Sequence, residues 1–137
     1  MDASRGRPWI RAALLAGLAY VLIGRIFAVP ATHVRAWRWA AWLASGVVFA
    51  THIGYEHFKP RSSPRLTASH AAAAVALGAL GLAVAGMIHT LSAGSPLRPA
   101  WLLALVVWPA ITGLPAFLVA LAAGALLARL WPGRDAA

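Results

Sequence analysis

Four apolar segments, each long enough to cross a lipid bilayer, constrain the fold of this sequence most strongly. They cover residues 9–29, 36–56, 67–91 and 100–131, and about 20 helical residues span a hydrocarbon core of ~30 Å. Charged residues make up 11% of the chain, whereas soluble domains carry about 25%. The sequence therefore predicts an all-α polytopic membrane protein, in which residues 1–137 form a single integral membrane domain, an antiparallel bundle of four transmembrane helices.

The fourth segment is too long for one perpendicular crossing, and it contains Pro109, Gly113 and Pro115. We expect a short helix up to Pro109, a break or kink after it, and a full span from Pro115 onward. A tilted single helix that is kinked at proline is the alternative. Because unwound backbone in a membrane exposes carbonyl groups that transporters use to bind substrates, Thr112, Gly113 and Pro115 are candidate binding residues.

The basic residues flank the apolar segments and give the chain a net charge of +9. If the N-terminus is cytoplasmic, the inner side carries Arg5, Arg7, Arg11, Lys59, Arg61, Arg65, Arg129 and Arg134, and the outer side carries Arg25, Arg35, Arg38 and Arg98. This excess predicts a multi-pass protein of the bacterial inner (plasma) membrane with both termini in the cytoplasm. The charge therefore indicates anionic lipid headgroups as partners and does not indicate nucleic acid.

Small residues recur at helical spacing in each segment, which is the packing signal expected where apolar burial cannot drive association. The repeats are Gly17 and Gly24 in the first segment, Gly46, Ala50 and Gly54 in the second, Ala74, Gly78, Gly81 and Ala85 in the third, and Ala116, Ala120, Gly124 and Ala128 in the fourth. A surplus face of this kind would allow a homo-oligomer or a place in a larger membrane complex. A monomer with all of these faces internal is the alternative.

Few residues are available for chemistry. The chain has no cysteine, which excludes thiol catalysis, iron–sulfur clusters and Cys-type zinc sites. Motifs for nucleotide binding, zinc proteases and serine hydrolases are absent from the sequence. An enzyme is therefore not indicated, and the sequence names no cofactor.

One cluster combines metal-ligating and proton-handling residue types. His52 and Glu56 are four residues apart and share a helix face if the second helix continues that far, and an antiparallel hairpin brings His70 to the same end. The three side chains could bind a divalent metal, or Glu56 with His52 could couple to protons. Alternatively, Glu56 forms a solvated ion pair with Lys59. Opposed histidines, including His33 with His89 at the other end, could instead clamp haem.

Arg25 lies inside the first apolar segment, and the predicted topology places no carboxylate on its side of the membrane. It must extend to the interface, bond backbone carbonyls, or bind an anion such as a lipid phosphate. We therefore expect a small inner-membrane protein for transport or for lipid or anion handling. The alternatives are a non-catalytic membrane subunit or scaffold that packs against partner proteins, and a His-ligated metal or haem carrier.

Overall fold

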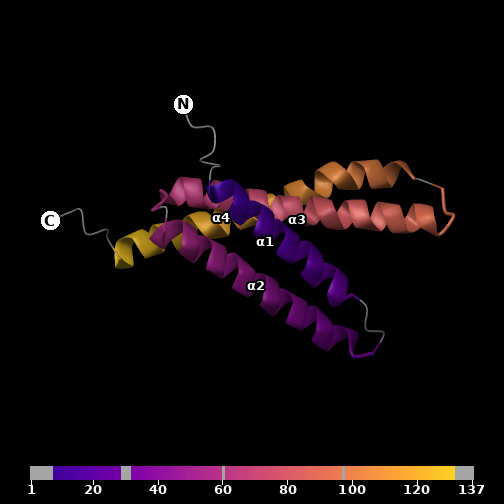
Figure 1. Cartoon of the computed structure of the whole chain (residues 1–137), viewed down its shortest axis with the longest axis horizontal. Coiled ribbons are helices and arrows are strands. Elements are labelled where there is room, and N and C mark those ends of the chain that lie inside the picture. Colours follow the sequence, from indigo (N-terminus) through magenta and orange to yellow (C-terminus); the bar gives the residue numbers. More distant parts are fainter. Residues whose placement is uncertain (1–7, 29–31, 60, 97, 132–137) are drawn as a thin grey trace.

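The computed structural model describes residues 8–28, 32–59, 61–96 and 98–131. Within them the chain forms four helices, α1 (Pro8–Ile26), α2 (Val34–Phe58), α3 (Pro64–Ser92) and α4 (Pro99–Leu130). Successive helices run in opposite directions, so the start of α1, the α2–α3 connector and the end of α4 lie at one end of the molecule (Figure 1). We call this the connector end. The all-α prediction is confirmed.

Three of these helices, α1, α3 and α4, are long and apolar enough to cross a membrane. The exception is α2, although its 25 residues make it longer than α1. Polar and charged side chains occur along it, among them Arg35, Arg38, His52 and Glu56. They lower its hydropathy below that of the other three helices.

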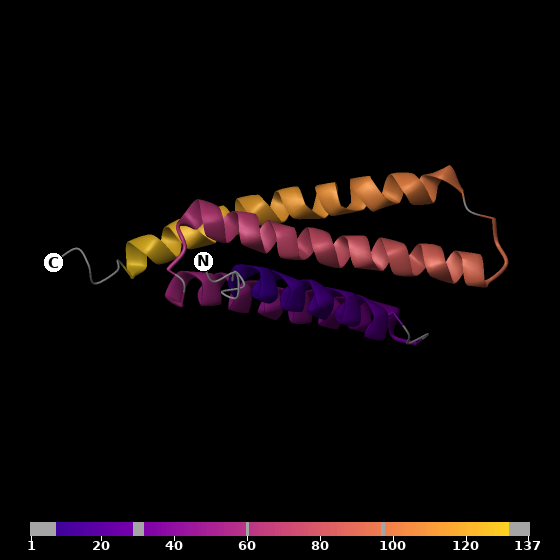
Figure 2. The same cartoon turned by 45° about the horizontal axis from the view of Figure 1, so that its top comes forward.

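The helices form a helical bundle that is made of two hairpins inclined to each other (Figure 1). The α1–α2 hairpin and the α3–α4 hairpin are separate layers in Figure 2. The central helix is α3, which packs along both α1 and α4, and within the described residues α1 does not contact α4. Small residues allow the close approach: a Cβ placed on Gly78 of α3 would lie 2.6 Å from the Tyr20 Cβ of α1. The small-residue faces of α1 and α3 are therefore packed against each other.

Some helices extend beyond the apolar segments from which they were predicted, because capping residues and not hydropathy set their ends. The third helix begins at Pro64 and not at Thr67 or Ser69, because Ser63 is its N-cap and accepts a hydrogen bond from the Leu66 backbone N–H at 3.4 Å. Proline suits the first helical position, where its missing N–H costs nothing. Likewise α2 continues through Phe58. The connector is therefore shorter than the sequence suggests.

The predicted break in the fourth segment is wrong, because α4 is a single helix with Pro109 and Pro115 inside it. Each proline removes one helical hydrogen bond. The Thr112 hydroxyl donates to the carbonyl oxygens of Trp108 at 2.8 Å and Pro109 at 3.2 Å. Packing against α3 also holds this region, since a Cβ on Gly113 would lie 3.4 Å from the Ala76 Cβ. The continuous-helix alternative is the one that the structure adopts.

The interior is made of small side chains, and large apolar side chains lie outside. Alanines such as Ala68, Ala74 and Ala120 are fully buried, whereas leucines and tryptophans along all four helices are exposed. The largest fully buried side chains are polar, namely Glu56 and Thr67. This distribution is the reverse of that in soluble domains, where Glu is almost never fully buried unless it is paired.

Candidate functional site

Glu56 is the centre of a buried polar cluster at the connector end. Because α2 extends to Phe58, Glu56 lies within the helix and not in the connector. Its exposed fraction is 0%. The prediction of a solvated ion pair with Lys59 is therefore wrong. A carboxylate at this depth requires partners that compensate for lost hydration.

Two side chains bind the same oxygen of Glu56. The Ser62 hydroxyl donates to Glu56 Oε2 at 2.7 Å, and His70 Nδ1 lies 3.0 Å from that oxygen. Ser62 comes from the connector, where its backbone N–H also donates to the Glu56 carbonyl oxygen at 3.0 Å. The indole of Trp9, from the first turn of α1, stacks on the His70 ring with centroids 4.4 Å apart. Three elements therefore fix the orientation of one carboxylate.

The second oxygen and a nearby imidazole have no partners. Glu56 Oε1 and His52 Nε2 are buried and make no hydrogen bond. His52 is 6% exposed and lies one helical turn before Glu56. It also lines a cavity of about 350 Å³ between α1 and α2, together with Thr51 and Tyr55. His52 therefore lies between the polar cluster and this cavity.

The structure brings His52, Glu56 and His70 to one place but not as a metal site. Among the described residues, no three His, Cys, Asp or Glu side chains are grouped to hold a metal ion. His70 Nδ1 is engaged by Glu56 and its ring by Trp9. His33 is an exposed residue at the N-cap of α2, and His89 is exposed in the last turn of α3. The arrangement is an acid–imidazole pair with a second imidazole beside it.

A second feature is an apolar cleft of about 590 Å³ that residues from all four helices line. Of the predicted binding residues, Thr112 and Pro115 line the cleft, whereas Gly113 is buried against α3. Arg25 is exposed and follows Gly24, which lines the cleft. The volume is within the usual range for small-molecule sites, about 300–1,000 Å³.

Polar groups of the cleft are few. Tyr20 lines it, and the Tyr20 hydroxyl is buried without a hydrogen-bond partner. Ser45 contributes a second hydroxyl, while that of Thr112 is engaged by its own helix. The cleft therefore suits a predominantly apolar ligand.

Sequence reasoning missed Trp9, Ser62 and Tyr20. The position of Ser62, between a predicted helix end and an N-cap serine, was a usable signal, because such connector residues often bond helix ends. Nothing in the sequence pairs Trp9 with His70 or directs Tyr20 toward the cleft, since both depend on how the hairpins cross.

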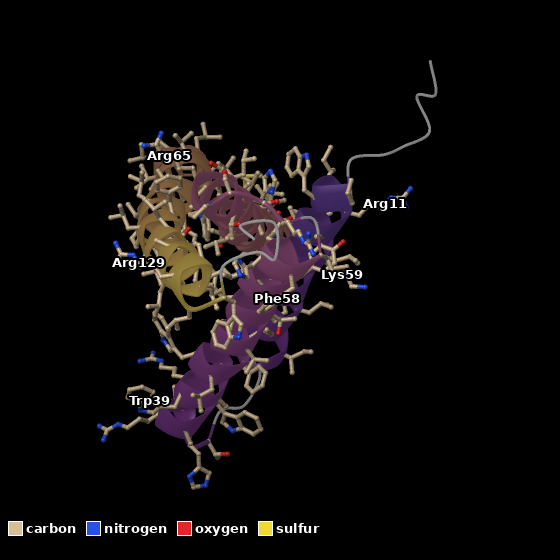
Figure 3. The ribbon with its side chains drawn as sticks, turned by 90° about the vertical axis from the view of Figure 1, so that its left-hand side faces the viewer. Arg11, Trp39, Phe58, Lys59, Arg65 and Arg129 are labelled. Atoms are coloured by element: carbon tan, nitrogen blue, oxygen red, sulfur yellow. The ribbon has the colours of Figure 1, made fainter. Side chains whose placement is uncertain are left out.

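Basic side chains surround the connector end. Arg11, Lys59, Arg65 and Arg129 are exposed there and project outward from four different segments (Figure 3). Of the other basic residues that the sequence predicts on this side, Arg5, Arg7 and Arg134 lie outside the described residues.

No protein-family model, curated protein or solved structure matches the chain.

Proposed function

We propose that this chain is a multi-pass inner-membrane protein, with both termini in the cytoplasm, that binds a lipid with an anionic headgroup. The apolar chain of the lipid would occupy the cleft, and Arg25 would bind the headgroup. Binding of this kind is the first step of a lipid- or anion-transport function. The observation that carries the proposal is the open apolar cleft, which all four helices line.

Membrane placement is supported by the distribution of side chains. Large apolar residues such as Leu15, Trp42, Leu43 and Val106 are more than two-thirds exposed. Soluble monomers rarely expose continuous apolar patches larger than a few hundred Å². The exposed cations at the connector end match the cytoplasmic side of a membrane protein.

The choice of an anionic lipid rests on charge. The end of α1 and the starts of α2 and α4 lie opposite the connector end (Figure 1). Arg25 is in the last turn of α1, Arg35 and Arg38 are near the start of α2, and Arg98 is the N-cap of α4. Glu56 is the only acidic residue that the structure describes, and it lies at the connector end. A phosphate headgroup would supply the missing negative charge at the mouth of an apolar site. Each basic residue near an anionic surface contributes about 1 kcal/mol.

Native mass spectrometry of the protein in detergent, with phosphatidylglycerol or phosphatidylcholine added, tests the proposal. We expect the anionic lipid to bind more tightly, and Arg25→Gln to weaken its binding roughly fivefold, as about 1 kcal/mol predicts. Arg11→Gln, at the connector end, is the matched control. Gly46→Leu should fill the cleft, because nothing lies within 4 Å of a Cβ at Gly46. Gly54→Leu is equally unobstructed but lies outside the cleft lining.

Equal binding of the two lipids, or equal binding by Gly46→Leu and Gly54→Leu, would overturn the proposal. A further outcome bears on the scaffold alternative. Gly46 and Ala50 of α2 are exposed, so a partner helix could pack there. A stable dimer that excludes lipid and is lost in Gly46→Leu would replace the lipid proposal with an interaction subunit.

A further inference from the structure

The Glu56 cluster contains two buried polar atoms without a hydrogen-bond partner. Glu56 Oε1 and His52 Nε2 lack hydrogen-bond partners, and both side chains are more than nine-tenths buried. A buried polar atom without a partner costs about 1–3 kcal/mol, and more where it is charged. Such atoms in a native structure call for an explanation in terms of function or a missing ligand.

The remaining contacts of Glu56 define the protonation state that fits this site. Oε2 receives Ser62 and His70, so it has its full set of donors in either state of the carboxyl group. A proton on Oε1 would remove the negative charge while leaving both contacts at Oε2 intact.

Charged and titratable groups around Glu56 come from every element packed at this end. His52 and His57 are on α2, and His52 is within electrostatic range of both Glu56 and His70. The other basic residues, from α1, the connector, α3 and α4, are exposed: Arg11, Lys59, Arg61, Arg65 and Arg129. The groups buried with the carboxylate are therefore imidazoles.

The surroundings give the cluster two sides. Ser62, on the connector, is half-buried. His52, deeper along α2, lines the cavity of about 350 Å³ between α1 and α2. A proton bound at Glu56 is thus one helical turn from an imidazole that lines this cavity.

We propose that Glu56 and His52 form a proton-binding and proton-transfer site. Glu56 Oε1 takes up a proton that enters past the half-buried Ser62. Because Oε1 and His52 Nε2 make no hydrogen bond to each other, one water must connect them. The Oε1–H bond breaks as its proton passes to this water, the water gives one of its own protons to the lone pair of His52 Nε2, and the O–H electron pair remains on Glu56. His70, Ser62 and Trp9 act as positioning residues, because they hold Oε2. This proposal is independent of lipid binding in the cleft.

The sequence offers a direct test, because Glu56 is the only glutamate in the chain. A ¹³C label on the glutamate carboxyl therefore reports this site alone in NMR spectra of the protein in nanodiscs. We expect the label to change between the spectra of a protonated and an ionised carboxyl group as pH is varied. A ¹⁵N signal of His52 should change over the same pH interval, as coupled sites do.

Two variants make the test specific. His52→Gln retains a polar side chain that cannot take up the proton. The pH-dependent change of the Glu56 carboxyl signal that coincides with His52 should therefore be lost. His57→Gln is the matched control on the same helix, because His57 is only half-buried and packs edge-on against Phe58, and it should leave the step unchanged. A carboxyl label that stays ionised throughout would overturn the proposal. So would identical behaviour of the two variants.

Discussion

The packing of α1 against α3 makes Gly78→Ala the most informative single change. A Cβ on Gly78 would lie 2.6 Å from the Tyr20 Cβ and 3.3 Å from the Gly17 carbonyl oxygen. Carbon atoms pack at about 3.5–4.0 Å, so α1 must move away by about 1 Å. Neither obstacle is the flexible end of a side chain. The clash is therefore relieved only by separating the helices.

The expected cost follows from two opposing contributions. Overpacking of a close interface costs about 1–3 kcal/mol. Replacing glycine with alanine inside a helix returns about 0.5–1 kcal/mol. Gly46→Ala on α2 receives the same gain without a clash, because nothing lies within 4 Å of its Cβ. The two variants should therefore differ in unfolding free energy by about 1–3 kcal/mol, with Gly78→Ala the less stable.

Unfolding by detergent titration, monitored by circular dichroism, measures both variants against the parent protein. Gly46→Ala should equal or exceed the parent in stability. If Gly78→Ala is as stable as Gly46→Ala, the Gly78–Tyr20 contact does not hold α1 to α3, and the packing argument fails. Gly81→Ala would give a second reading of the same interface, because its Cβ would lie 2.5 Å from a methyl group of Val21.

Two further changes test the polar cluster and α4. Ser62→Ala removes a donor to a buried carboxylate and should lower the free energy of unfolding by about 1.5–3 kcal/mol. The control, Ser69→Ala at an exposed position, should stay within about 0.5 kcal/mol of the parent. Equal effects of the two changes would show that Ser62 does not stabilise Glu56. Pro115→Ala restores a helical hydrogen bond in the continuous α4 and should raise the free energy of unfolding by about 0.5–1.5 kcal/mol. The control, Pro99→Ala at the first helical position, should be nearly neutral. A loss of stability in Pro115→Ala would mean that the proline itself shapes α4.

Helix number and type could be predicted because they depend on local sequence. Apolar runs long enough for helices of 19 to 32 residues can be read from the sequence directly. Because successive helices form hairpins, the sequence also predicts that His70 lies near Glu56. The predicted break in α4 was wrong because proline alone does not end a helix whose neighbours hold it. The start of α3 was misplaced because Ser63 followed by Pro64 is a stronger N-terminal signal than Thr67.

The site was predicted in its residues but not in its depth. Spacing placed His52 and Glu56 on one face, yet it left Glu56 in a polar connector. Burial of Glu56 depends on α2 continuing past it and on Trp9 of α1 covering His70. The cleft depends on the inclination of the two hairpins, which follows from the packed Gly78–Tyr20 contact between α1 and α3. Neither has a signature within a single helix.

The attachment of α2 connects the cluster with the cleft. Where α1 meets α3, glycines lie in close contact, but a Cβ on Gly46 or Gly54 of α2 would touch nothing. What holds α2 to α3 is concentrated near the connector end, where Ile53 packs with Ala68 and Ala71, and where Glu56 binds His70. Because the glycines of α2 make no close contact elsewhere along the helix, the Glu56–His70 pair and the Ile53 contacts carry a large share of this attachment. Weakening it should therefore loosen α2 along the length that borders the cleft.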